Sequence, residues 1–184
     1  MRSEFRSVTV NQAVELIIDH RGRTPKKLGG DFTDDGVQVI SAKNVYGGRL
    51  HAGESCRFVP PEMAERWMPM PLEMGDVLLT SEAPLGEAAY LGRPAEFCLG
   101  QRLFALRTRP GTANPRFTYY ALRSPPVQAR LHARATGTTA QGIKQSELRQ
   151  VELDLPDLAE QERVAAVLGA LDDKSTATGA WPPS

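Results

Sequence analysis

The side chains best suited to chemistry lie in a short polar loop, residues 136–142, with the sequence TGTTAQG. Its two glycines free the backbone, and its three threonines and one glutamine offer short hydrogen-bond donors and acceptors. Lys144 follows two residues after the loop. These groups suit the recognition of a polar ligand. We therefore expect Thr138, Thr139, Gln141 and Lys144 to bind such a ligand.

Two more loops combine cations with small polar groups. Residues 19–30 carry four Lys and Arg around Thr24, one of them Lys26. Four cations beside a hydroxyl could grip phosphates, and a solvated basic loop is the alternative. Lys43 and Asn44 follow an expected strand. Asn can bond adenine in a bidentate way and Lys suits guanine or phosphate, whereas an Asx turn with an exposed lysine is the alternative.

The motifs that would indicate catalysis are incomplete. Residues 114–117, NPRF, resemble the Asn-Pro-Pro-Tyr/Phe signature of amino-group DNA methyltransferases, but Arg116 replaces the second proline that rigidifies that turn. The sequence has no glycine-rich S-adenosylmethionine loop, no Walker loop and no Gly-x-Ser-x-Gly elbow. Its three histidines are scattered, without the spacing of metal ligands. We expect no catalytic residue and no metal site.

Composition indicates a soluble, ordered protein. The 184 residues are 41% hydrophobic with a net charge of zero, which suits one sizeable domain plus an appendage. No apolar run approaches the ~20 residues of a membrane span, and the first residues lack the apolar core of a signal peptide. Cys56 and Cys98 lie far apart, outside any CxxC spacing. A cytoplasmic location with free thiols is therefore expected.

The neutral total hides an uneven charge distribution. Residues 100–150 hold nine Lys and Arg against one acidic residue, a net charge of +8. A basic block inside a neutral protein favours a polyanionic ligand. The alternative is that these arginines only solvate helix faces.

The elements that must position these loops follow from periodicity and turn signals. An amphipathic helix is expected at residues 9–18, and further helices at 60–67, 114–124, 125–134 and 158–173. Strands are expected at 37–40, 77–81, 88–91, 103–106 and 151–155. Together they predict an α+β fold. Ser81, Gln101 and Arg102 fall at strand ends, where rigid scaffolds usually present binding residues.

Several motifs, in order, resemble one known family. They are Gly22–Pro25, Gly75–Leu79, Leu85-Gly86, Gly100–Arg102, Phe117–Leu122, Gly137–Thr139, Ile143, Leu148 and Leu155–Gln161. They are similar to the target recognition domain of the specificity subunit of type I restriction-modification enzymes, in which a PLPPLxEQ segment opens a long helix. Each motif alone is weak, whereas their order and spacing over residues 10–174 are fairly specific.

The resemblance implies a mixed-sheet target recognition domain at 1–156, a projecting docking or spacer helix at 157–174, and a disordered tail at 175–184. It implies a non-catalytic subunit that reads half of a split site in double-stranded DNA and directs a methyltransferase (M) subunit, and through it a restriction (R) subunit. S-adenosylmethionine would belong to the methyltransferase subunit. The DNA-binding residues expected are Thr24, Lys26, Lys43, Asn44, Ser81, Gln101, Arg102, Thr138, Thr139, Gln141 and Lys144.

The final helix carries an apolar stripe formed by Val164, Val167, Leu168 and Leu171. Such a stripe could bind the methyltransferase subunit or a second copy of the chain in a weak homodimer. As one helix, residues 158–173 span ~24 Å at ~1.5 Å per residue, which is short beside the ~34 Å of a DNA turn. One domain implies a half-subunit, a truncated product or an excised domain. A protein-interaction module without independent DNA binding is the alternative function.

Overall fold

The computed structural model describes residues 4–53, 56–94, 96–138 and 140–178. At its centre is an antiparallel sheet of four strands in the order β2-β10-β7-β8. Its strands are β2 (Val14–Asp19), β10 (Leu103–Thr108), β7 (Val77–Ser81) and β8 (Leu85–Tyr90). All five residues of β7 are buried, because the strand is central and both of its faces are covered. The expected core strand at 77–81 is confirmed.

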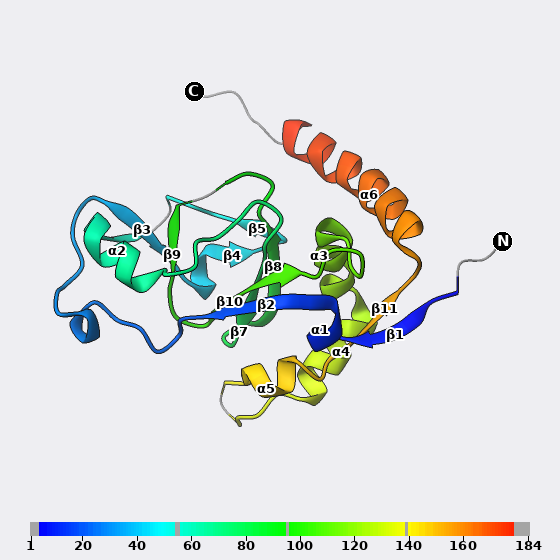
Figure 1. Cartoon of the computed structure of the whole chain (residues 1–184), viewed down its shortest axis with the longest axis horizontal. Helices are drawn as coiled ribbons and strands as arrows, with labels where there is room; N and C mark the ends of the chain where they lie inside the picture. The colour runs from blue at the N-terminus through cyan, green and yellow to red at the C-terminus, as the bar shows by residue number, and fades with distance from the viewer. Residues whose placement is uncertain (1–3, 54–55, 95, 139, 179–184) are drawn as a thin grey trace.

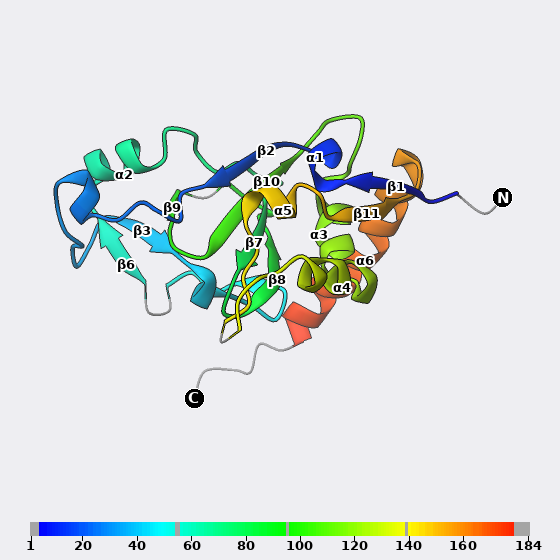
Figure 2. The ribbon, with the colours of Figure 1, turned by 90° about the horizontal axis from the view of Figure 1, so that it is seen from below.

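A smaller lobe lies at one end of the molecule, on the left of Figures 1 and 2. It is a mixed sheet, β6-β3-β9, in which β3 pairs antiparallel with β6 and parallel with β9. The strands are β3 (Val37–Ile40), β6 (Arg57–Val59) and β9 (Phe97–Leu99), and α2 (Pro61–Trp67) covers one face. We call this unit the distal lobe. Its small core contains Trp67, which is 1% exposed.

Helices gather at the opposite end (Figure 1). The helices α3 (Pro115–Arg123) and α4 (Pro125–Ala133) pack on the central sheet, and the long α6 (Leu158–Thr178) lies beside α3. The strand β1 (Arg6–Thr9) pairs antiparallel with β11 (Glu152–Leu155) just before α6. The short elements are α1 (Val10–Ala13), η1 (Lys26–Leu28), η2 (Ala42–Asn44), β4 (Val45–Tyr46), β5 (Arg49–Leu50) and α5 (Gln145–Leu148). The predicted α+β class is confirmed.

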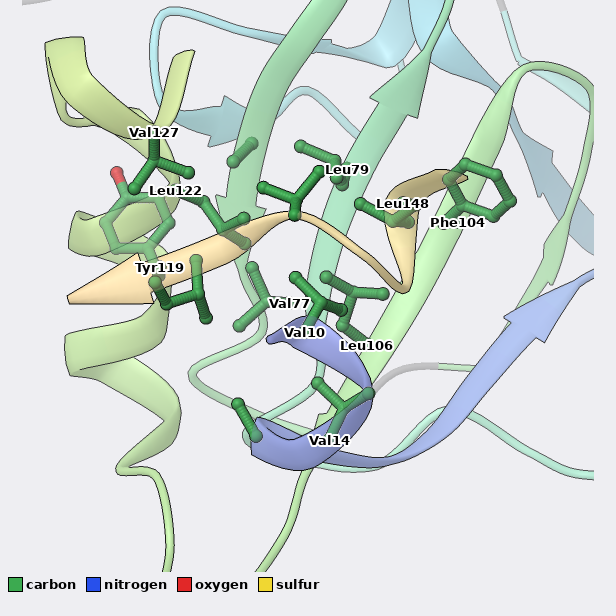
Figure 3. Close-up of a cluster of buried hydrophobic side chains, with 14 of the residues drawn as sticks. Val10, Val14, Val77, Leu79, Phe104, Leu106, Tyr119, Leu122, Val127 and Leu148 are labelled. Carbon is green, nitrogen blue, oxygen red and sulfur yellow. The ribbon is translucent and has the colours of Figure 1, made fainter. Parts of the chain in front are cut away.

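The largest core cluster fills the space between the central sheet and these helices. Figure 3 shows Val77, Leu79, Phe104 and Leu106 of the sheet facing side chains of α1, α3, α4 and α5. A second cluster, which includes Leu78 and the hairpin β4-β5, covers the other sheet face. Val77 and Leu79 of β7 therefore enter one core, and Leu78 between them enters the other, as the strand's period of two requires.

The helix expected at residues 9–18 is wrong. Only Val10–Ala13 form a helical turn, and Val14–Asp19 are a strand paired with β10. The spacing of Val14, Ile17 and Ile18 fits a helix, and all three are buried as expected. Pairing with a strand some 90 residues away overrides that local pattern, helped by the β-branched side chains and by a bulge near Arg107.

The final helix also differs from the expectation. It continues to Thr178, so that the first four residues of the expected tail, 175–178, are helical. The rest of that tail, residues 179–184, lies outside the described residues. The cap is as expected, since the Glu160 amide donates to Asp157 Oδ1 at 2.9 Å.

Candidate nucleic-acid interface

A cavity of about 270 Å³ opens at the end of the distal lobe. Three of the expected DNA-binding residues, Thr24, Lys43 and Gln101, line it although they lie far apart in the sequence. The other lining residues are Arg23, Pro25, Phe32, Val39, Ser41, Arg57 and Trp67. Its wall is therefore apolar and its polar groups are mainly donors. We call it the distal cavity.

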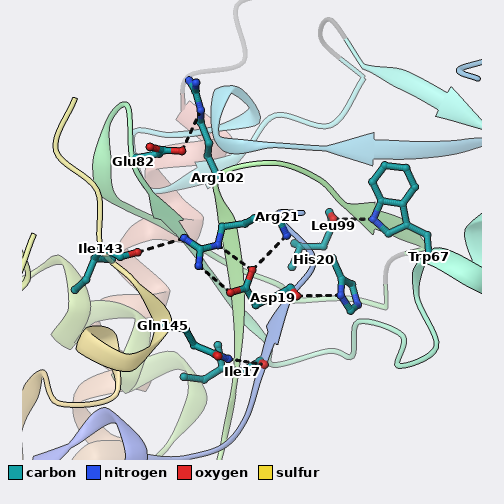
Figure 4. A network of polar contacts seen from close by, with 10 residues as sticks. All are labelled: Ile17, Asp19, His20, Arg21, Trp67, Glu82, Leu99, Arg102, Ile143 and Gln145. Atoms are coloured by element: carbon teal, nitrogen blue, oxygen red, sulfur yellow. Dashed lines mark hydrogen bonds and ion pairs between the residues drawn. The ribbon is translucent and has the colours of Figure 1, made fainter. Parts of the chain in front are cut away.

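The loop that contains Thr24 is held against α2. The Arg23 guanidinium donates to the carbonyl oxygens of Trp67 and, at 2.9 Å, of Arg66. A cation at the last carbonyls of a helix is a favourable cap. Trp67 Nε1 donates to the Leu99 carbonyl at 3.0 Å (Figure 4). Arg23 is thus used inside the protein, whereas Lys26 is exposed on η1 nearby.

Asn44 has a structural role, which corrects the expected contact with a base. Its side chain is 1% exposed. Asn44 Oδ1 accepts from the Ser41 amide at 3.0 Å, and Nδ2 donates to the His51 carbonyl at 3.4 Å. Backbone groups therefore occupy both the oxygen and the nitrogen of the Asn44 side chain, which stabilises η2. The preceding residue, Lys43, is exposed next to the cavity. The alternative of an Asx-type turn with an exposed lysine describes this loop.

A second group of expected residues surrounds the loop 136–144. Gly142 bridges to Glu82 and to Thr136, and the Ile143 amide donates to the Ser81 carbonyl at 2.9 Å. Gly137 has φ +111°, a conformation that requires glycine. Thr138, Gln141 and Lys144 are exposed, and the Gln141 amide oxygen lies 3.1 Å from His132 Nδ1. The expected residue Thr139 lies outside the described residues.

Ser81 contributes to this group through its backbone, which corrects the expected side-chain contact. The residue is fully buried, and its Oγ has no hydrogen-bond partner among the described residues. A side chain without exposure cannot reach a base edge in this conformation. Its carbonyl oxygen, by contrast, accepts from the Ile143 amide and so anchors the loop at residues 136–144.

An arginine beneath the loop fixes its position. Arg21 donates to both carboxylate oxygens of Asp19 at 2.8 Å and to the Ile143 carbonyl at 3.2 Å, as Figure 4 shows. Its guanidinium carbon lies 4.1 Å from the centre of the Phe104 ring. Arg21 is a scaffold residue, since its guanidinium is used in this way by partners inside the protein.

The turn at residues 100–102 joins the two groups. The Gln101 carbonyl accepts from the Ala42 amide at 3.3 Å, on the side of the distal cavity. The Arg102 carbonyl accepts from the Ser81 amide at 2.9 Å, on the side of the loop. Arg102 has φ +62°, and its side chain pairs with Glu82 at 3.3 Å while remaining about half exposed. The fold therefore brings the two groups together at a single turn.

Most arginines of the basic block at 100–150 have partners within the protein. Arg107 pairs with Glu73 and Asp76, Arg116 with Asp173, Arg130 with Asp154, and Arg134 with Glu147. Arg109 donates to two backbone carbonyls and Arg149 to Asn11. Carboxylates outside the block therefore pair with Arg107, Arg116 and Arg130, whereas Glu147, the partner of Arg134, belongs to the block itself. This corrects the electrostatic argument. Within the described residues, the side chain of Lys144 makes neither an ion pair nor a hydrogen bond, whereas Arg109, Arg123 and Arg149 make hydrogen bonds but no ion pair.

The helix α6 is fastened along one side and open along the other. Gln161 is fully buried, and its Nε2 donates to the Pro156 carbonyl at 2.9 Å while its Oε1 accepts from the Asn114 amide at 2.8 Å. Tyr120 donates to Asp172 at 2.8 Å further along the helix. On the outer side, Val167 and Leu171 are 62% and 58% exposed. Half-buried Val164 and Leu168 complete the predicted stripe.

Sequence reasoning missed Arg57 and Phe32. The Arg57 guanidinium carbon lies 4.8 Å from the centre of the Phe32 ring, at the distal cavity. A lone arginine at the start of a strand carries no motif, and the aromatic residue lies 25 positions earlier. The bridge between Thr33 and Phe58 of β6, which joins distant parts of the sequence, brings them together.

The surroundings of His20 determine the protonation state of its imidazole. Burial, followed by the charge of Arg23, lowers the pKa of His20 below its ordinary value, so that the imidazole is neutral at pH 7. No cluster of metal-ligating side chains occurs among the described residues. In that same part of the chain, no helix is long and apolar enough to cross a membrane. Cys56 and Cys98 are free thiols, as expected.

Comparison with known proteins identifies a family. Residues 3–179 match the family model described as the type I restriction modification DNA specificity domain. The MjaIX specificity subunit of Methanocaldococcus jannaschii, a type I restriction enzyme subunit, is 31% identical over 99 residues, covering 54% of this chain and 22% of that protein. The MjaVIII specificity subunit of the same organism is 25% identical over 150 residues, covering 78% and 35%.

Solved structures show the same fold. The S subunit of a type I restriction-modification system from M. genitalium matches with a TM-score of 0.64 at 22% identity, over 94% of this chain and 40% of that one. The HsdS subunit of Thermoanaerobacter tengcongensis matches with a TM-score of 0.61 at 22% identity, over 96% and 39%. The chain thus spans about a third or less of the curated relatives and about two fifths of the solved chains.

Proposed function

The chain belongs to the family of type I restriction modification DNA specificity domains, and on that premise we propose that it reads one part of a split DNA sequence for a larger complex. The relatives are named specificity subunits, which agrees with the prediction of a non-catalytic component. The observation that carries the proposal is the turn at 100–102, which joins the residues around the distal cavity to the loop at 136–144.

The proposed reading surface consists of polar side chains on anchored backbone, all of them exposed except Thr24, which is half-buried. Its members are Thr24, Lys26, Lys43, Gln101, Arg102, Thr138, Gln141 and Lys144. Phosphate contacts by the lysines would set the position on the duplex, and base contacts would supply the specificity. Asn44 and Ser81 support this surface from inside.

The proposed partners are a methyltransferase subunit, which would carry S-adenosylmethionine, and through it a restriction subunit. The outer face of α6 is the proposed docking surface. There Val164, Val167 and Leu168 line a shallow groove of about 500 Å³ together with Glu160 and Arg163. An apolar stripe with a charged border is typical of a helix that packs against another helix. A weak homodimer through the same stripe is the second arrangement.

Binding to mixed-sequence duplex DNA tests the recognition role. The chain should shift the duplex in a gel, and log K should fall by about 0.9 per phosphate contact against log salt. Few exposed lysines line the surface, so we expect a shallow slope and weak binding. An absence of any shift at low salt would favour a protein-interaction module instead.

Two measurements test the division of labour. The chain alone, given labelled S-adenosylmethionine and DNA, should give background counts, and incorporation above a heat-killed control would contradict a non-catalytic role.

Val167→Glu should weaken association with the methyltransferase subunit or a second copy in sedimentation. Ala166→Glu, on exposed α6 surface outside the stripe, is the matched control and should have no effect.

A further inference from the structure

Arg57 and Phe32 are both held in place by backbone pairing at the mouth of the distal cavity. Arg57 opens β6 and lies opposite Val39 of β3. Thr33, the neighbour of Phe32, bridges to Phe58, with its amide donating to the Phe58 carbonyl at 2.9 Å. The stack between the guanidinium and the ring therefore joins two segments with fixed backbone.

Stacking determines which part of the guanidinium is available. The guanidinium carbon of Arg57 lies 4.8 Å from the centre of the Phe32 ring, so one face of the cation rests on an apolar surface. The N–H donors of a guanidinium lie in its plane and form a rigid fork. A ring beside the cation restricts where the guanidinium can lie, and the fork can still meet two acceptors side by side.

The cavity lining determines which acceptors fit. Lys43 and Arg57 supply positive donors, and the described residues of the lining include no acidic side chain. In the major groove, guanine presents two adjacent acceptors, O6 and N7. Cytosine presents an N4 donor, to which a carboxylate can bind. A lining rich in donors and without carboxylates therefore selects guanine.

A phosphate is a poorer match for this arrangement. A fixed guanidinium fork pairs with a phosphate as well as with guanine, but a phosphate makes no use of an apolar wall. The wall formed by Phe32, Val39 and Trp67 is typical of a place where base edges, including a thymine methyl group, are accommodated. Gln101 on the same lining is a side chain that can bond adenine in a bidentate way.

We propose that Arg57, oriented by Phe32, forms a guanine-reading subsite in the distal cavity and determines one base pair of the recognised DNA sequence. The inference rests on the proposed function, because it assigns a base to part of the same surface. Gln101, at the turn between the two groups, reads a neighbouring pair.

Selection from a random duplex library tests the subsite, because every base is offered at every position of the DNA. The chain should enrich a motif that contains a G·C pair. Arg57→Ala should enrich the same motif with that one position relaxed, since a bidentate pair discriminates by roughly 5- to 150-fold. Phe32→Leu keeps the charge and an apolar side chain but removes the stack, and should weaken the preference at the same position.

A modified base gives a second, atomic test. Replacing that guanine by 7-deazaguanine removes the N7 acceptor. The wild-type chain should then lose affinity, whereas Arg57→Ala should bind both duplexes equally. Arg6→Ala is the matched control, because Arg6 is exposed on β1 at the opposite end of the molecule (Figure 2). Thermal unfolding of each variant checks that the fold is intact.

The outcomes separate the inference from the function. If Arg57→Ala selects an unchanged motif and only lowers the salt slope by about 0.9, Arg57 contacts a phosphate and the subsite is overturned. An unchanged motif without any change of slope overturns it as well. If the wild-type chain enriches no motif at all, the proposed function itself fails and the subsite with it.

Discussion

The arginines of residues 100–150 and the cations around the distal cavity differ in what surrounds them. The arginines of the block reach carboxylates and carbonyls from distant parts of the chain, as Arg107 does with Asp76 at 2.9 Å. Around the distal cavity, no carboxylate is found among the described lining residues, and Lys43 and Arg57 are exposed. The block has the higher charge in the sequence, but partners within the protein engage most of its arginines.

This difference teaches that positive charge serves two purposes in one small domain. An arginine whose fork is filled by internal acceptors holds elements together. An exposed cation that lies beside donors and apolar groups can meet an external anion or base. The number of cations in a segment does not distinguish these two purposes. They are distinguished by the hydrogen-bond acceptors that lie within reach of each cation.

The largest expected effect concerns the structural arginines. Arg107→Ala should lower the free energy of unfolding by about 3–5 kcal/mol, because it leaves the carboxylate of Asp76 buried without its partner. The Arg107 and Asp76 side chains are 17% and 1% exposed. Urea denaturation measures the change. Arg134→Ala removes a pair whose side chains are 41% and 43% exposed and should cost less than about 1 kcal/mol. Equal effects of the two variants would contradict the comparison.

A neutral residue should behave like the structural arginines. Gln161→Leu removes the hydrogen bonds to the Asn114 amide and the Pro156 carbonyl, and should cost about 1–3 kcal/mol because these buried groups lose their partner. Hydrogen exchange should become faster at the start of α6. Glu162→Gln, at an exposed neighbouring position, should leave exchange unchanged. Wild-type exchange in Gln161→Leu would show that the helix is held elsewhere.

Salt dependence should separate the two sets of cations. Lys43→Ala and Lys144→Ala should each reduce the slope of log K against log salt by about 0.9 if each lysine contacts one phosphate. Arg109→Ala should leave the slope unchanged, because its guanidinium donates to the carbonyls of Gln12 and Val14. Titrations with duplex DNA at several salt concentrations give the slopes. A reduced slope for Arg109→Ala would mean that block arginines do reach DNA.

The smallest expected effect concerns the buried thiol of Cys98, which lies in the small core of the distal lobe. Burial raises the pKa of Cys98 to about 11, so the folded state favours the protonated thiol. That contribution to stability is fully present below the unfolded value of about 8.5 and is lost as pH rises through about 11. At pH 8, iodoacetamide should therefore label half-buried Cys56 before Cys98, as measured by mass spectrometry.

The rate at which Cys98 is labelled also measures whether the distal lobe remains folded in a variant. Arg57→Ala should leave Cys98 protected, because Arg57 is exposed and lies outside the small core that contains the thiol. Fast labelling of Cys98 in that variant would show that Arg57 supports the lobe, and its effect on DNA binding would then need a structural explanation.

The sequence by itself determined the features that depend on neighbouring residues. The strand at Val37–Ile40, the buried strand at Val77–Ser81 and the cap at Asp157 follow from period, composition and turn chemistry within a few positions. The family was also recognisable from the order of short motifs, and the match over residues 3–179 confirms it. Thr24 was predicted from its place among the cations of a loop, and Lys43 and Gln101 from their places at strand ends. The fold puts all three around one cavity.

Only the tertiary structure decided which polar side chains are accessible. Asn44 and Lys43 are neighbours in the sequence, yet the amide is closed by Ser41 and His51 while the lysine is exposed. Residues 14–19 became a strand for the same reason, since β10 satisfies their backbone from a distance. A hydrogen bond or an ion pair depends on groups that meet in space, often tens of residues apart. Local pattern can therefore predict an element, but it does not show which of its polar groups the folded chain has already used.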